Sequence, residues 1–398
     1  MKISFKVSEI PLSFAARKNE VKTLEIKTDC NNLKVFAQSD HNEIPLKLNS
    51  EINLGDRVDI VLLPHRIELY VNGELKDEEW PFGNLLFSRD DEFEPKINAL
   101  VEELAKNETE LPSVVSSFEN AEGWNPGNGV FVGDCMPYRR GDEYHVMYLK
   151  DRHHHRSKWG YGAHQWEHIS TKDFRTFNIH PTAIPISEPW EGSICTGSWI
   201  KNGDKEYLYY TVRCEAGKPA PICRSVSDDG YHFINDKAFG FALSEKYDAQ
   251  SARDPKVVMG ADGLFHMFLT TKLIKENRGC LAHCISRDME KWEEADEPIY
   301  IAPDSHSPEC PDYFEYMGKY YLVFSLCGKA HYMISDKPFE GFYMPDAPTV
   351  PCASVPKAAE WKGRLIFVGF RGMDGYAGTM TFKAATAKEN GELVFSEL

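Results

Sequence analysis

The sequence predicts an all-β protein in which a small N-terminal β-sandwich precedes a five-bladed β-propeller. Three observations lead to this prediction. The first ninety residues alternate apolar and polar side chains in short runs, the remainder contains five aromatic-rich repeats, and 398 residues exceed what one ordinary core needs. We expect the sandwich over residues 1–95, a helical linker over 96–118 and the propeller over 119–398.

The N-terminal region carries strand signals followed by one helical signal. Apolar and polar residues alternate in VKTLEIKTD (21–29), DRVDIVLLP (56–64) and RIELYVNGEL (66–75), and Asn72-Gly73 is a hairpin turn signal. INALVEELAKN (97–107) spaces its apolar residues as a helix does, and Pro112 marks a boundary after it. Two roles are open for this region: a structural cap, or the surface of a homo-oligomer.

The rest of the chain is organised as a repeat. Five segments share a turn followed by an aromatic-rich strand: GDEYHVMYLK (141–150), GDKEYLYYTVR (203–213), DGLFHMFLTTK (262–272), MGKYYLVFSLC (317–327) and WKGRLIFVGFR (361–371). Four of them are followed by a strand that ends in a Ser/Asp turn: HISTKDF (168–174), RSVSDDG (224–230), HCISRDM (283–289) and YMISDKP (332–338). Ordered units of this kind predict a five-bladed propeller; a many-stranded sandwich is the structural alternative, but it does not explain why the units match in order.

Three carboxylates occupy corresponding places in this repeat. Counting back ten residues from the aromatic strand of the first unit, and eleven in the others, reaches Asp134, Thr196, Asp254, Glu309 and Ser354. In a propeller, such positions on the innermost strands surround the central channel. Asp is disfavoured in strands, and like charges are costly to gather, so the arrangement points to a chemical use.

Glycoside hydrolysis is a chemistry that needs such a group. One carboxyl must donate a proton to the leaving oxygen, while another must be ionised to attack the sugar or to activate water. Crowding of like charges separates the two roles. The bland alternative is that these acids pair with Arg253, Arg139 or Arg140 and only hold the blades together.

The composition limits the classes of partner that the protein is expected to bind. The formal charge of −16 disfavours binding to phosphate backbones, so we expect no nucleic acid, and a neutral or weakly polar carbohydrate fits better. The sequence shows no secretory signal and no apolar run of about 20 residues, so we expect no membrane association. The ten cysteines are scattered without a CxxC pair, which favours reduced thiols and a cytoplasmic protein.

At this point the motifs resemble a known family. RDP (253–255) and EC (309–310), in that order on successive units, resemble glycoside hydrolase family 32, which holds invertases, inulinases and levanases. The first-blade run YHVMYLKDRHHHRSKWGYGAHQWEHISTKDF (144–174), CTGSW (195–199) and KAAEWKGRLIFVGF (357–370) are also similar to segments of that family. The resemblance extends over roughly residues 125–371.

The resemblance implies a role for each acid. Asp134 would be the nucleophile, and Glu309 the general acid and then the base. Asp254, with Arg253 beside it, would bind sugar hydroxyls and stabilise the transition state. Trp159, Cys195 and Thr196 match pocket-lining positions of the family. Retaining chemistry would place the two reacting carboxyls about 5–5.5 Å apart.

Two departures from the family pattern are visible. The family's Asn-Asp-Pro-Asn-Gly reads Gly133-Asp134-Cys135-Met136-Pro137 here, and the glutamine expected near Leu149–Lys150 is absent. The family's β-sandwich usually follows the propeller, whereas the sandwich predicted here comes first.

Other conspicuous residues receive plainer interpretations. We expect Cys310 to point to the strand face opposite Glu309 as a packed thiol, because side chains alternate along a strand. The run His153–His155 is expected to be a loop or the rim of a sugar site, with no metal and no cofactor bound. Trp159 and Trp190, in loops before strands, are candidate sugar platforms. Trp166 and Trp199 are expected to pack within blades.

The sequence therefore predicts an O-glycosyl hydrolase that acts on small oligosaccharides. A retaining β-fructofuranosidase is the first hypothesis. Two alternatives remain open: an inverting furanosidase or xylosidase-type propeller hydrolase, and a sugar-binding propeller without activity.

Overall fold

In the computed structural model, every regular element of the described residues is a β-strand. Its description covers residues 1–398 except 41–45, 64–65, 80–83, 96–99, 103–113, 118–122, 128, 156–163, 189 and 215–219. Within the described residues there is no helix, and hence none that is long and apolar enough to cross a membrane. The all-β fold class is confirmed.

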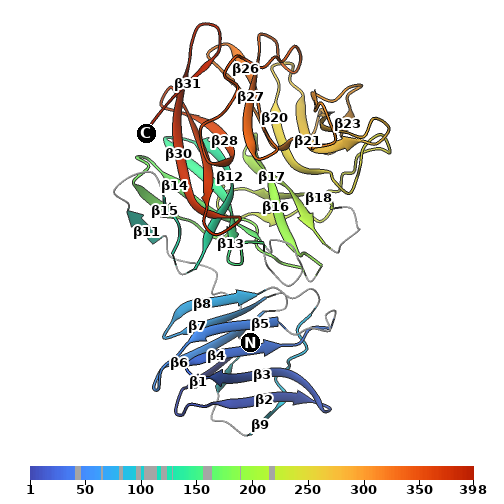
Figure 1. The fold of residues 1–398 in the computed structure, drawn as a ribbon. Coiled ribbons are helices and arrows are strands. Elements are labelled where there is room, and N and C mark those ends of the chain that lie inside the picture. Colours follow the sequence, from blue (N-terminus) through green and yellow to red (C-terminus); the bar gives the residue numbers. More distant parts are fainter. Residues whose placement is uncertain are drawn as a thin grey trace.

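The N-terminal part is a sandwich of two antiparallel sheets, the lower blue body in Figure 1. One sheet has the order β10 (Leu100–Glu102), β1 (Lys2–Lys6), β6 (Arg57–Leu62), β7 (Ile67–Val71), β8 (Glu74–Glu79). The other has the order β5 (Leu46–Glu51), β4 (Asn32–Ala37), β3 (Val21–Asp29), β2 (Ser13–Lys18), β9 (Glu92–Glu94). Apolar residues of both sheets, such as Ile60 and Val35, share one buried core.

The predicted helix over 97–107 is wrong where the structure describes it. Residues 100–102 form strand β10, in which Leu100 pairs with Ser4 of β1 and Glu102 with Lys2. Helical periodicity is a weak local preference, and pairing with an open sheet edge overrides it here. The remainder of the predicted helix lies outside the described residues.

The C-terminal part consists of antiparallel units that follow one another along the chain. The first unit contains β11 (Val114–Ser117), β12 (Phe131–Arg140), β13 (Glu143–Asp151), β14 (Gln165–Thr171) and β15 (Thr176–Ile179). The second contains β16 (Ser193–Asn202), β17 (Lys205–Arg213), β18 (Ile222–Ser227) and β19 (Ile234–Asn235). The third contains β20 (Arg253–Met259), β21 (Phe265–Leu273), β22 (Arg278–Ser286), β23 (Glu293–Glu294) and β24 (Tyr300–Ile301). The fourth contains β25 (Glu309–Tyr316), β26 (Lys319–Leu326) and β27 (Lys329–Ser335). The fifth contains β28 (Ser354–Trp361), β29 (Arg364–Gly372), β30 (Gly378–Ala387) and β31 (Leu393–Ser396).

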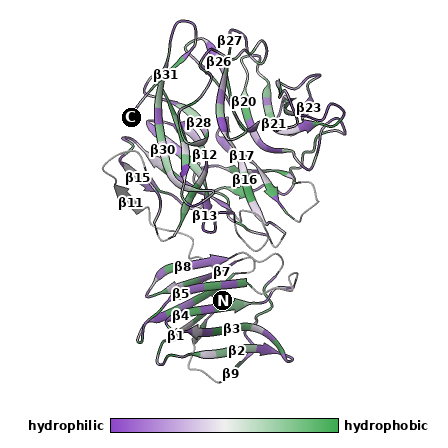
Figure 2. Ribbon diagram, in the orientation of Figure 1, coloured by the Kyte–Doolittle hydropathy of each residue, from purple (hydrophilic) through white to green (hydrophobic). Residues whose placement is uncertain are grey.

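The first strands of these units form a closed ring. Strand β12 contacts β16, which contacts β20, then β25, then β28, and β28 contacts β12 again. Chain closure is marked by a pair between Val132 of β12 and Gly378 of β30, which joins the first and last units. Figure 2 shows hydrophobic and hydrophilic stretches within the same strands, and apolar clusters fill the space between neighbouring units. This ring is the arrangement that a propeller requires.

Three of the four Ser/Asp turns predicted from the repeat share one backbone contact. The hydroxyl of Thr171 accepts the N–H of Phe174 at 2.8 Å, that of Ser227 accepts the N–H of Gly230 at 2.8 Å, and that of Ser286 accepts the N–H of Met289 at 2.9 Å. Asp and Ser side chains stabilise turns by such bonds to the backbone. Units matched by sequence are therefore matched in local geometry.

Candidate active site

A bulge near the start of each first strand builds the site. Pairing with the second strand of the unit is interrupted between Val132/Cys135, Ile194/Gly197, Arg253/Lys256, Glu309/Asp312 and Ser354/Lys357. Two residues in each interruption are unpaired, and a bulge re-aims the side chains around it. Asp254 and Cys310 have positive φ angles of 58° and 52°, so the alternation of a regular strand is lost there.

The three acids therefore occupy three different positions of the same bulge. Asp134 is its second residue, Asp254 its first, and Glu309 the residue just before it. The count of ten or eleven residues back from the aromatic strand placed all three at one equivalent position, which is wrong by one residue for Asp254 and by two for Glu309. The acids, called the acid cluster below, still gather at one end of the first strands, because Cys310 and Arg253 contact them in pairs.

Asp134 is buried, 8% exposed, and receives hydrogen bonds on both oxygens. The Tyr376 hydroxyl donates to Oδ1 at 2.8 Å. The Thr196 hydroxyl and the Cys310 thiol, the latter at 3.3 Å, donate to Oδ2. A carboxylate that accepts three donors is held in one orientation.

Tyr376 escaped the sequence analysis, although one signal for it was present. A side chain at position 133 would place its Cβ only 2.6 Å from the Tyr376 hydroxyl, so Gly133 leaves the space in which that hydroxyl lies. The unusual glycine before Asp134 and the tyrosine thus belong together. Burial, followed by the charge of Asp134, raises the pKa of Tyr376 well above its ordinary value, so the phenol is a proton donor.

Asp254 is 4% exposed and is bound mainly from the fourth unit. The backbone N–H of Cys310 donates to its Oδ2 at 3.0 Å, and the Thr270 hydroxyl donates to the same atom at 3.3 Å. Nε of Arg253 lies 3.6 Å from this oxygen. The left-handed backbone at Asp254 is what turns its carboxylate toward the fourth unit.

Glu309 differs from both aspartates in its exposure. Its side chain is 51% exposed, and its one described hydrogen bond comes from Nη2 of Arg253 at 2.8 Å. Arg253 therefore bridges Glu309 and Asp254. The pairing of these acids with Arg253, one part of the structural alternative, is thus observed. Arg140 instead pairs with Glu206 at 2.8 Å, and Arg139 donates to the Gly141 carbonyl.

The prediction for Cys310 is wrong in direction. Its sulfur does not face away from the acids but lies between them, 3.3 Å from Asp134 and 3.7 Å from Asp254. The bulge is the reason, because a positive φ at Cys310 breaks the alternation on which the prediction depended. Burial, followed by the charges of Asp134 and Asp254, raises the pKa of the thiol well above its ordinary value, so Cys310 is a packed thiol and a weak donor.

The other predicted pocket residues are only partly placed. Thr196 contacts Asp134 directly. Burial raises the pKa of the Cys195 thiol to about 11, with Asp254 and Asp134 among the charges that act on it. Trp190 is 42% exposed on the surface, and Trp159 lies outside the described residues, so their roles as sugar platforms stay predictions.

The two remaining tryptophans pack within the propeller, as predicted. The Trp166 indole is fully buried and donates to the Cys195 carbonyl at 2.9 Å. Trp199 stacks on Tyr138 with ring centroids 4.4 Å apart and donates to Glu206 at 2.7 Å.

The loop that contains His153–His155 contacts Tyr376, which itself donates a hydrogen bond to Asp134 of the acid cluster. His154 hydrogen-bonds the Tyr376 carbonyl at 2.6 Å, and the His155 ring packs against the Tyr376 ring with centroids 3.6 Å apart. The buried Asp151 organises this loop, because it binds the His164 ring at 2.7 Å and accepts the backbone N–H groups of His153, His154 and His155. Asp151, His155 and His164 are close enough to share an ion, but the carboxylate already accepts four donors.

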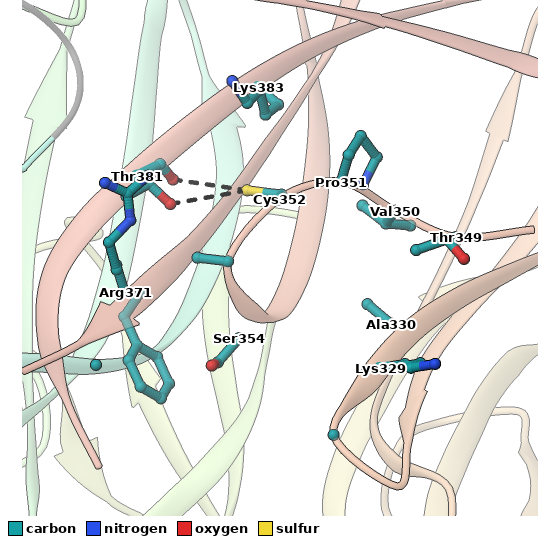
Figure 3. A pocket seen from close by; sticks show the side chains of 14 residues that line it. Lys329, Ala330, Thr349, Val350, Pro351, Cys352, Ser354, Arg371, Thr381 and Lys383 are labelled. Carbon is teal, nitrogen blue, oxygen red and sulfur yellow. Dashed lines mark hydrogen bonds between the residues drawn. The ribbon is translucent and has the colours of Figure 1, made fainter. Parts of the chain in front are cut away.

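A cavity of about 370 Å³ adjoins the site between the fourth and fifth units. Figure 3 shows Ser354, the residue before the fifth bulge, on its wall together with Lys329 and Arg371. Phe370 also lines it and packs against Tyr376 with ring centroids 5.0 Å apart. The cavity is therefore in contact with the environment of Asp134.

The N-terminal sandwich is attached beside this site by a buried ion cluster. Glu78 of β8 is 1% exposed and binds Lys150 and Arg152 of the first unit, each at 2.6 Å. Burial raises the pKa of Glu78, but the charges of Lys150 and Arg152 outweigh it and hold the pKa at about 2. Lys150 and Arg152 flank the Asp151 that orders the histidine loop, so the sandwich supports one wall of the site.

A family model covers the part of the chain that carries the three acids. The model of "Glycosyl hydrolases family 32 N-terminal domain" matches residues 134–348, more than half of the chain. Sucrose-6-phosphate hydrolase from Vibrio alginolyticus is 23% identical over 195 residues, which cover 46% of this chain and 39% of that protein. The chain thus matches about two fifths of the length of this relative.

Solved structures show the same fold at lower identity. Fructan 1-exohydrolase IIa from Cichorium intybus, solved as a point variant in complex with 1-kestose, aligns with a TM-score of 0.58 at 17% identity, over 71% of this chain and 61% of that one. CoXyl43, a GH43 β-xylosidase/α-arabinofuranosidase from a compost metagenome, aligns with a TM-score of 0.53 at 14% identity, over 71% and 98%. From the matched family model, the chain belongs to glycosyl hydrolase family 32.

Proposed function

We propose that the protein is a retaining glycoside hydrolase of small β-fructofuranosides, with Asp134 as nucleophile and Glu309 as acid and base. The observation that carries the proposal is the unequal treatment of two acids in one cluster. Asp134 is buried beneath three donors, whereas Glu309 is half-exposed and held by one arginine. Membership in family 32 supports the same assignment.

The surroundings of Asp134 suit a nucleophile. Tyr376, Thr196 and Cys310 all donate to its carboxylate, which fixes the attacking oxygens in place. In the first step an oxygen of Asp134 would attack the anomeric carbon and form a glycosyl ester while the leaving oxygen departs.

The surroundings of Glu309 suit proton transfer. Its exposed carboxyl can exchange protons with solvent, and it has room to reach a leaving oxygen. It would protonate that oxygen in the first step and take a proton from water in the second, which restores the enzyme. Asp254, fixed by Cys310 and Thr270, would accept hydrogen bonds from sugar hydroxyls.

The proposed substrate class comes from the relatives. One relative is named for hydrolysis of sucrose-6-phosphate, and one similar structure holds 1-kestose. We therefore propose sucrose, sucrose-6-phosphate and short fructans as the substrates to try. A cytoplasmic location and a homo-oligomer formed through the N-terminal sandwich stay predictions, as do the bounds chosen for the domains and the blade count.

Turnover by two variants tests the proposal. Release of fructose from the three substrates is measured for the protein, Asp134→Asn and Glu309→Gln. We expect loss of roughly 10²–10⁴-fold for Glu309→Gln and at least as much for Asp134→Asn. Unchanged turnover in both variants would overturn the assignment, as would absence of turnover on all fructosides.

One alternative keeps the acids and changes the outcome. The resemblance of the fold to CoXyl43, together with the altered segment Gly133–Pro137, favours testing pentosides and an inverting reaction. Proton NMR of the first anomer released separates the two: retention supports double displacement, and inversion supports direct attack by water. Tight sugar binding without turnover would instead indicate a binding propeller.

A further inference from the structure

A group of three histidines lies in the first unit, away from the residues of the acid cluster. His145 comes from β13, His168 from β14, and His180 follows β15. One ligand nitrogen from each can be chosen so that all three lie within 4.8 Å of one another. We propose that this group binds a divalent transition metal ion, with Zn²⁺ as the best fit. The proposal does not depend on the proposed function.

The spacing of the nitrogens is close to that of a metal site. Nδ1 of His145 and Nε2 of His168 are 2.9 Å apart. Two nitrogens bound to zinc at about 2.0–2.1 Å in a tetrahedral arrangement would be about 3.3 Å apart. A shift of a few tenths of an ångström would therefore convert this contact into two metal bonds.

The hydrogen bonds within the group are incomplete. Nδ1 of the fully buried His168 has no hydrogen-bond partner among the described residues. Its Nε2 instead faces both the Tyr138 hydroxyl, at 3.0 Å, and His145. An ion shared with His145 would bind Nε2, where these two contacts meet, and not Nδ1.

The third unit supplies an internal reference for the same pair. His266 and His283 occupy the repeat positions of His145 and His168, and their nitrogens are 2.8 Å apart. There the pair is completed by Asp262, 3.2 Å from His266, and is covered by the Phe339 ring. A histidine pair is thus a structural feature of the repeat, and His180 is what turns the pair of the first unit into a three-ligand group.

The charges around the group permit a cation. Arg140, the cation that acts on all three, is already paired with Glu206. Oε2 of Glu143 lies 3.9 Å from Nε2 of His145, so a negative charge stands beside the group.

Cobalt titration tests the site without any assay of activity. Co²⁺ is added to the metal-free protein and the visible d–d absorption is followed, with Zn²⁺ used to displace it. We expect one equivalent to bind, with a band of tetrahedral intensity. His180→Gln should weaken binding at least tenfold, because it removes a ligand from the half-buried edge of the group.

Two matched variants locate the signal. His283→Gln alters the corresponding pair of the third unit, and His155→Gln alters the other three-residue group near Tyr376; neither should change the cobalt band. Circular dichroism and the melting temperature show whether each variant is folded, and His145→Gln serves as a second ligand variant. Absence of binding at millimolar Co²⁺, an unchanged band in both ligand variants, or loss of the band in His155→Gln would each overturn the proposal.

Discussion

Asp134 and Glu309 are two carboxylates of one cluster that the fold treats in opposite ways. Asp134 is 8% exposed and is bound by a phenol, a hydroxyl and a thiol. Glu309 is half-exposed and is bound by Arg253. The difference arises from the position of each acid in the bulge of its own unit. Asp134 is the second bulge residue and is buried, whereas Glu309 precedes the bulge and is exposed. A repeated backbone feature thus produces two chemically distinct acids.

Glu78 provides a third reference, a carboxylate buried for support. Its partners are two cations rather than neutral donors, and it joins the sandwich to the first unit. A neutral-donor cluster keeps the charge of a carboxylate available for reaction, whereas ion pairing neutralises it. The predictions below test these contrasts in order of expected effect.

The largest effect should depend on the leaving group. Asp134→Asn should lose about 10⁴-fold or more in kcat on both sucrose and an aryl fructoside, because the nucleophile is needed for either substrate. Glu309→Gln should lose roughly 10²–10⁴-fold on sucrose and much less in the first step on the aryl fructoside, whose leaving group needs no proton. Pre-steady-state release of the phenol measures this step. Equal losses by both variants on both substrates would contradict the division of roles.

Tyr376→Phe should produce an intermediate effect. It removes one hydrogen bond of about 1.5–3 kcal/mol to the Asp134 carboxylate, so kcat/KM should fall roughly 10- to 100-fold. Tyr321→Phe is the matched control, because that buried hydroxyl donates to the Gly391 carbonyl and not to a residue of the acid cluster. An activity loss of the same size in the control would mean that Tyr376 acts only through stability.

Glu78→Ala should destabilise the protein without removing a catalytic group. It leaves Lys150 and Arg152 beside an empty buried position, at a cost of about 3–5 kcal/mol in unfolding free energy. Urea denaturation followed by fluorescence measures this change. Unaltered stability would show that the ion cluster is not what attaches the sandwich.

The lowered pKa of Glu78 predicts that the stability of the protein depends on pH. The pKa of Glu78 is about 2 in the folded protein, below the ordinary value of 4.5. Its contribution is therefore fully present above pH 4.5 and is lost as pH falls from about 4.5 to 2. Melting temperatures between pH 6 and pH 3 should fall more steeply for the native protein than for Glu78→Gln; parallel curves would contradict this assignment.

Cys310→Ala should have the smallest effect on turnover. A thiol is a weak donor, so we expect a loss of only a few-fold in kcat/KM. Iodoacetamide at pH 7.5 should label the exposed Cys30 and Cys327 and leave Cys310 unmodified. Loss of all turnover in Cys310→Ala, together with rapid labelling, would contradict this account and would indicate that Cys310 is the nucleophile.

The repeat made the fold and the acids predictable, because ordered aromatic strands and Ser/Asp turns are local signals. The direction of Cys310 was not predictable, since the bulge that turns it appears only when the strands are paired. Tyr376 was missed because it lies in a turn of the fifth unit, 242 residues from Asp134 along the chain. The helix predicted over 97–107 failed where β10 pairs with β1, because an unpaired sheet edge outweighs local periodicity.

Capture of the covalent intermediate tests the central claim most directly. Glu309→Gln is mixed with an aryl fructoside, quenched in acid and mapped by peptide mass spectrometry. The account predicts one hexosyl adduct, carried by the peptide that contains Asp134 and absent in Asp134→Asn/Glu309→Gln. An adduct on another residue, or complete release of product with inverted configuration and no adduct, would contradict it.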